Sequence, residues 1–121
     1  MNRPLSPHLQ IYRLPLTAWL SITHRITGVV LSFGLVVLVG ILLVIAGAGE
    51  GYQTLQAFLH GFWSQTVLLL WLLALFLHFC HGIRHLLWDV ILGFERERLP
   101  RHSLVELLAA LGLTCLAWLW I

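Results

Sequence analysis

Three histidines, one arginine and one aspartate are gathered in residues 78–89, HFCHGIRHLLWD, at the end of a long apolar run. On a helix that turns about 100° per residue, His78, His81, His85 and Asp89 fall on one stripe. Ionisable groups in a membrane-spanning helix normally face the bundle interior, a cavity or a cofactor. The stretch therefore predicts a polar stripe with a binding role.

His78 differs from the rest of this stripe in depth. It precedes Asp89 by about 16 Å of helical rise, at roughly 1.5 Å per residue, which places it well inside the hydrocarbon. A neutral imidazole there needs a hydrogen bond or a metal as its partner. Gly82, one turn later, removes a side chain from the same face and would let a flat ring lie there, although it could equally serve close helix packing. The pair favours haem, whereas for His85 and Asp89 a position at the membrane interface is an equally good explanation.

A second polar stripe, on an earlier apolar segment, consists of Ser21, His24, Arg25, Gly28 and Ser32. The guanidinium of Arg25 offers a fork of donors that suits carboxylates, and haem propionates are carboxylates. The alternative is that Arg25 extends to the lipid headgroups, as arginines near the ends of spans usually do. Ser21, one turn before Arg25, adds a second polar group on the same face and favours an inward role.

A haem iron with two axial ligands receives them from opposite faces of the porphyrin. His78 and His81 belong to one helix, so they cannot both bind one iron. His24 could be the second ligand, which would leave Arg25 as the only obvious cationic partner for the propionates. A second chain that donates a histidine is the other solution, and the spacing does not choose between the two.

The composition is that of an integral membrane protein. The chain has 121 residues, of which 60% are hydrophobic and 10% charged, against about 25% charged in soluble domains. This length suffices for three or four spans of about 20 residues and for no soluble catalytic domain. The net charge of +2 is too small to indicate a nucleic-acid partner. Cys80 and Cys115 form no CxxC pair, so we expect two buried free thiols and neither a zinc site nor covalently attached haem.

The elements that must position these residues are all helical. We expect an all-α integral membrane protein with three transmembrane helices. The whole chain, residues 1–121, is then a single membrane-anchor domain. Its predicted parts are a cytoplasmic arm (1–14), span one (15–48), an interfacial helix (52–62), span two (64–90), a cytoplasmic loop (93–103) and span three (104–121).

The placement of the arginines predicts the orientation. Arginines precede span one and occupy the loop between spans two and three, whereas the loop between spans one and two contains Glu50 and no basic residue. By the positive-inside rule, the N-terminus and the second loop are cytoplasmic and the C-terminus lies outside. The N-terminal residues have neither the apolar core of a secretory signal nor the character of a transit peptide. We therefore expect a multi-pass protein of the bacterial inner membrane.

Three stretches, RPLSPHLQIY, SITHRITG and HFCHGIRHLLWD, resemble the signatures of the cytochrome b556 membrane-anchor subunits of succinate dehydrogenase, respiratory complex II. The resemblance covers the whole chain and implies that its three helices pack with a second anchor subunit into a haem-binding bundle. It implies a haem b-binding anchor of a succinate:ubiquinone oxidoreductase, which takes part in electron transport and the tricarboxylic acid cycle. By this resemblance, succinate is oxidised at a flavin in another subunit, and electrons pass through iron–sulfur clusters to ubiquinone at the membrane.

The resemblance also assigns roles to individual residues. His78, with Gly82 in the same motif, matches the axial haem ligand of this subunit, and the other ligand is a histidine of the second, smaller anchor subunit. His24 and Arg25 match the pair near the propionates. The residues that match the ubiquinone site beside the iron–sulfur subunit are Ser21, Arg25, Leu14 and Ile22. His81 matches no position with a known role.

Other functions remain as alternatives. The nearest is the anchor of a quinol:fumarate reductase, which shares this architecture. A haem-carrying electron-transfer module that works alone and a haem-free structural anchor are further candidates, but a purely structural anchor would have no use for a histidine as deep as His78. A transporter is disfavoured because the spans lack paired broken helices at the middle of the membrane.

Overall fold

The computed structural model describes residues 11, 13–47, 49–90, 92 and 99–121. Within these residues the chain forms the helices α2 (Leu16–Gly47), α3 (Glu50–Leu59), α4 (Phe62–Asp89) and α5 (Leu99–Trp120). Three of them, α2, α4 and α5, are long and apolar enough to cross a membrane. The expectation of an all-α protein with three candidate spans is confirmed.

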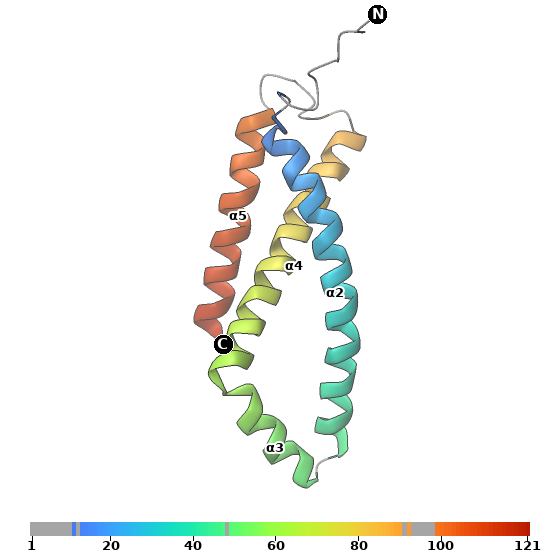
Figure 1. Ribbon diagram of the computed structural model, residues 1–121, viewed down its shortest axis with the longest axis vertical. Coiled ribbons are helices and arrows are strands. Elements are labelled where there is room, and N and C mark those ends of the chain that lie inside the picture. Colours follow the sequence, from blue (N-terminus) through green and yellow to red (C-terminus); the bar gives the residue numbers. More distant parts are fainter. Residues whose placement is uncertain (1–10, 12, 48, 91, 93–98) are drawn as a thin grey trace, which may run out of the picture.

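The three long helices lie side by side, and α4 packs against both others (Figure 1). α2 runs away from the N-terminal end, the short helix α3 turns the chain at the far end, α4 returns, and α5 runs in the same direction as α2. The start of α2, the end of α4 and the start of α5 are therefore brought together. We call this region, residues 16–28, 78–89 and 99–106, the polar end of the bundle.

The helix bounds follow from local signals and differ in places from those expected. α2 begins directly after Pro15, whose carbonyl oxygen accepts hydrogen bonds from the backbone N–H of Ala18 (3.0 Å) and of Trp19 (3.3 Å). α5 begins at Leu99, five residues before the predicted start of span three, because Pro100 is tolerated in a first helical turn. Of the predicted loop 93–103, the last five residues are therefore helical and residues 93–98 lie outside the described part. The predicted arm also lies largely outside it.

Most of the residues that the chain buries are polar. Only Leu20 and Ala110 are buried apolar residues in the described part, whereas the buried polar or charged residues are Thr27, His81, Arg84, Ser103, Glu106 and Thr114. Lipid is as apolar as leucine, so membrane helices associate through close packing and polar contacts rather than through an oily core. This chain places those polar contacts mainly at the polar end.

Away from the polar end, α2 and α4 make a close contact at Gly34 and Trp71. A Cβ added at Gly34 of α2 would overlap the indole ring of Trp71 on α4, so only a glycine fits there. The two cysteines are free, but the expectation that both are buried is wrong. Cys80 is half-buried and Cys115 is exposed.

Candidate functional site

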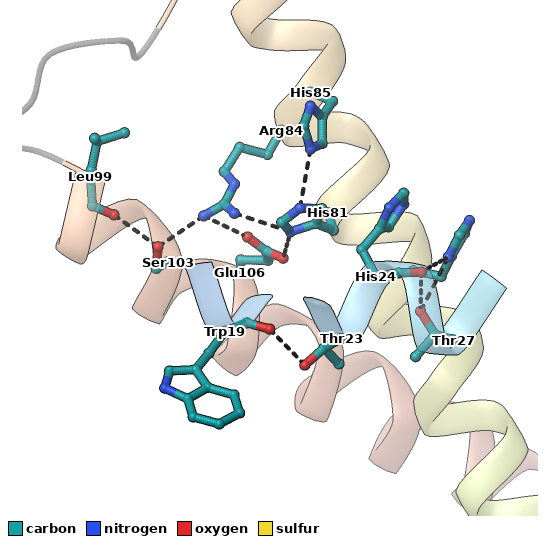
Figure 2. A network of polar contacts seen from close by, with 11 residues as sticks. Trp19, Thr23, His24, Thr27, His81, Arg84, His85, Leu99, Ser103 and Glu106 are labelled. Atoms are coloured by element: carbon teal, nitrogen blue, oxygen red, sulfur yellow. Dashed lines mark hydrogen bonds and ion pairs between the residues drawn. The ribbon is translucent and has the colours of Figure 1, made fainter. Parts of the chain in front are cut away.

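The imidazole of His78, on α4, is hydrogen-bonded to α2 through one of its two nitrogens. Nδ1 lies 3.1 Å from the backbone carbonyl oxygen of His24 and 3.2 Å from Oγ1 of Thr27. A carbonyl oxygen only accepts hydrogen bonds, so we assign the ring proton to Nδ1. The Thr27 hydroxyl donates to the same carbonyl, at 3.0 Å, and so can accept from Nδ1 (Figure 2). The lone pair of His78 is therefore on Nε2.

This arrangement is the one that metal-binding histidines usually have. Such a histidine donates its second ring N–H to a carbonyl or carboxylate, which fixes the tautomer and aims the other nitrogen at the metal. Nε2 of His78 has no hydrogen-bond partner in the described part of the chain. Thr27, whose hydroxyl is the second hydrogen-bond partner of Nδ1, was not singled out from the sequence. The signal that could have indicated it is a second threonine, Thr23, one turn earlier on the same helix.

Two glycines lie near His78, and the structure gives them different surroundings. A Cβ added at Gly28 of α2 would come within 3.1 Å of Cε1 of His78, so this glycine lets the imidazole approach the helix. A Cβ at Gly82 would meet nothing within 4 Å. Gly82 therefore borders open space, which suits a flat ring, whereas the close packing that the sequence offered as its alternative role is found at Gly28.

His24 lies flat against His78. The two rings are stacked, with centroids 4.0 Å apart and an angle of 10° between their planes. The lone pair of an imidazole nitrogen lies in the plane of its ring, so two stacked imidazoles cannot both aim a lone pair at one iron between them. In this geometry His24 is a neighbour of the candidate ligand and not its counterpart.

A buried polar network lies beside this pair and joins α4 to α5. Nδ1 of His81 lies 2.6 Å from Oε1 of Glu106. Arg84 donates through Nη1 to Oγ of Ser103, at 2.8 Å, and the same nitrogen forms an ion pair with Oε2 of Glu106 at 2.9 Å (Figure 2). His81 is only 2% exposed, and both charged partners are buried. The negative charge of the Glu106 carboxylate and the positive charge of the Arg84 guanidinium thus neutralise each other inside the bundle.

The network extends from His81 to the surface of α4. Nε2 of His85, an exposed residue, lies 3.2 Å from Nε2 of His81. Nδ1 of His81 also lies 3.0 Å from Nη2 of Arg84, so the carboxylate of Glu106 and the guanidinium of Arg84 both face this nitrogen, while Nε2 faces His85. Both nitrogens of His81 are therefore occupied, and this residue is not available as a ligand.

The sequence predicts no role for His81, and Glu106 does not stand out in it as a site residue. The spacing of the polar residues could have indicated the network. Arg84 follows His81 by three residues, and on the next helix Glu106 follows Ser103 by three residues.

Among the described residues, the four that are predicted to bind quinone lie at or near the surface, and none of them is buried. Ser21 is half-buried and Arg25 is exposed, and neither makes a side-chain hydrogen bond or ion pair in the described residues. Leu14 and Ile22 are 44% and 39% exposed. Of the predicted site residues on α2, only His24 is brought against His78.

Comparison with known proteins gives a consistent result. Residues 1–120 match the family model of the succinate dehydrogenase/fumarate reductase transmembrane subunit. The chain is 37% identical to the succinate dehydrogenase cytochrome b560 subunit of Reclinomonas americana, over 98% of this chain and 86% of that protein. It is 42% identical to the succinate dehydrogenase cytochrome b556 subunit of Paracoccus denitrificans, over 84% of this chain and 78% of that protein.

A third relative, the cytochrome b556 subunit of Rickettsia felis, is 34% identical over 97% of this chain and 91% of its own length. The resemblance noted in the three sequence stretches is therefore confirmed over nearly the whole chain. The chain belongs to the family of succinate dehydrogenase/fumarate reductase transmembrane subunits.

Proposed function

We propose that this chain is the haem b-binding membrane anchor of a succinate:ubiquinone oxidoreductase. The observation that carries the proposal is the attachment of His78, whose Nδ1 faces the carbonyl oxygen of His24 and the hydroxyl of Thr27. It leaves Nε2 as the nitrogen that holds the iron. A bound haem b supplies one-electron redox chemistry, tuned by its axial ligands and their hydrogen bonds. The cytochrome names of the relatives agree with this cofactor.

The haem is shared with a second anchor subunit, which supplies the other axial histidine. Two features of this chain support the sharing. His24 is stacked on His78, and His81 is held through both of its nitrogens. Arg25, which is exposed, is left to pair with the propionates, and the open space beside Gly82 accommodates the ring.

The same end of the bundle contributes to the ubiquinone site. The Ser21 hydroxyl donates to a carbonyl oxygen of the quinone, and Arg25 stabilises the negative charge that develops there during reduction, an effect that is large in a dry site. Leu14 and Ile22 provide apolar lining. Their exposure in the single chain fits a pocket whose remaining walls come from the iron–sulfur subunit and the second anchor.

These roles set the orientation and the partners. The polar end and the N-terminus face the cytoplasm, where the anchor tethers the iron–sulfur and flavoprotein subunits to the bacterial inner membrane. An anchor of a quinol:fumarate reductase is the alternative, because the matching family includes the transmembrane subunits of both enzymes. The two functions differ in the direction of electron flow and not in the residues of this site.

The test is a redox difference spectrum of the complex purified with the subunits that accompany this chain. Replacing His78 by leucine removes the proposed iron ligand, so we expect the b-type signal to be lost while flavin-level succinate oxidation continues. The matched control is His60→Leu, because His60 is exposed and lies at the far end of the bundle, after α3. A b-type signal that survives His78→Leu refutes the assignment.

A further inference from the structure

We propose that Glu106 of α5 is a positioning residue for the haem site, because it fixes His81 and, through that ring, the stacked pair of His24 and His78. The inference rests on the proposed function, since it concerns the orientation of the proposed iron ligand. It gives a role to α5, none of whose described residues makes a hydrogen bond or ring contact with His78.

The first step is the contact between Glu106 and His81. Oε1 of the carboxylate lies 2.6 Å from Nδ1 of the imidazole, and both side chains are buried. The carboxylate is itself held, because its other oxygen pairs with Arg84 and Arg84 also donates to Ser103. A buried group with fixed partners on two helices has little freedom to turn.

The second step is that His81 is held at both ends of its ring. Its Nε2 lies 3.2 Å from Nε2 of His85, and the two rings meet edge to face with centroids 4.9 Å apart. Turning the ring of His81 about its Cβ–Cγ bond would break the contact with Glu106 and the contact with His85 together. The plane of this imidazole is therefore determined by Glu106 and His85, together with Arg84, whose Nη2 lies 3.0 Å from the same Nδ1 as the carboxylate.

The third step is that His24 links the orientation of the His81 ring to that of His78, the proposed iron ligand. His24 lies between two imidazoles, with its centroid 4.7 Å from that of His81 and 4.0 Å from that of His78. No ring nitrogen of His24 makes a hydrogen bond in the described residues, so packing between the two neighbouring rings sets its side-chain conformation. A change in His81 therefore moves His24, and His24 faces the plane of His78.

This chain of contacts predicts a spectroscopic effect. The g values of a low-spin haem depend on the orientation of its axial imidazole planes, so they report a rotation of His78 that leaves ligation intact. We expect Glu106→Leu and His81→Phe to shift these g values in the assembled complex, because each breaks the contact between the two residues. Both variants should also release haem about tenfold faster, the lower limit for residues that orient a metal ligand.

Two further variants separate positioning from general damage to α5. Glu106→Gln keeps an oxygen that can accept from His81 but loses the charge opposite Arg84, so its g values should lie closer to those of the wild type. Thr114→Val is the matched control, because Thr114 is also buried on α5 and its hydroxyl donates, within the described part of the chain, to the carbonyl oxygen of Ala110 alone. Its g values should equal those of the wild type.

Wild-type g values and haem release in both Glu106→Leu and His81→Phe would overturn the inference. An equal shift in Thr114→Val would also overturn it, since loosening of α5 would then explain the effect. If Glu106→Leu fails to assemble, the assembled His81→Phe and Glu106→Gln complexes decide in the same way. These outcomes are distinguishable from failure of the proposed function, which is shown by haem that remains bound after His78→Leu.

Discussion

The two halves of α2 differ in what they contact. At the polar end, Leu20 and Thr27 are buried, and His24 lies among imidazoles of α4. Over residues 29–47 no side chain is buried within this chain, and a row of valines, leucines and isoleucines is exposed. In lipid an exposed apolar face costs nothing, whereas an unpaired polar group is expensive. The polar end therefore holds the helices of this chain together, and the apolar half is left to lipid and other subunits.

The largest effect is expected from breaking the buried ion pair at the polar end. Arg84→Met or Glu106→Leu leaves its partner charged and buried, at a cost of about 3–5 kcal/mol. Thermal unfolding of the purified complex in detergent measures the loss. The double variant should be more stable than either single variant, because it leaves no uncompensated charge. Equal and additive losses below about 0.5 kcal/mol each would show that this pair does not hold α4 to α5.

The close contact in the apolar half predicts an intermediate effect. Gly34→Leu would overlap the indole of Trp71 and should destabilise the complex by about 1–3 kcal/mol through overpacking. Gly40→Leu is the control on the same helix, because a Cβ there meets nothing within 4 Å. Trp71→Ala combined with Gly34→Leu should recover part of the loss. If both leucine variants behave alike, this contact does not contribute to the packing of the apolar half.

A smaller effect, on activity rather than on stability, is expected at the surface of the polar end. Ser21→Ala removes the proposed donor to quinone, and the loss of one hydrogen bond of about 1.4 kcal/mol lowers quinone reduction roughly tenfold. Succinate oxidation with an artificial acceptor should not change. Ser32→Ala serves as the control, because Ser32 lies on the same stripe and donates to the carbonyl oxygen of Gly28. Parallel loss of both activities would indicate defective assembly.

The comparison also explains what the sequence could predict. The three spans follow from the length of their apolar runs, and His78 stands out because so polar a group lies so deep. The contact between His81 and Glu106 was not predicted, since the spacing of the polar residues shows only which face of each helix is polar, and the contact depends on the register of α5 against α4. The start of α5 was placed too late because the charged and polar residues Arg101 and His102 are typical of a loop. The first turn of a helix can nevertheless contain such residues where it lies outside the apolar part of the span. Spacing alone also left open whether His24 is a ligand.

The central claim is that this chain provides half of a haem site, with His78 as its ligand and His24 as a neighbour. The most direct measurement is the spin state of the haem in the assembled complex that carries His24→Leu. A haem with two axial imidazoles is low-spin, and we predict that it stays low-spin in this variant while His78→Leu abolishes the signal. A high-spin haem, or loss of haem, in His24→Leu together with a low-spin haem in His78→Leu would contradict the account.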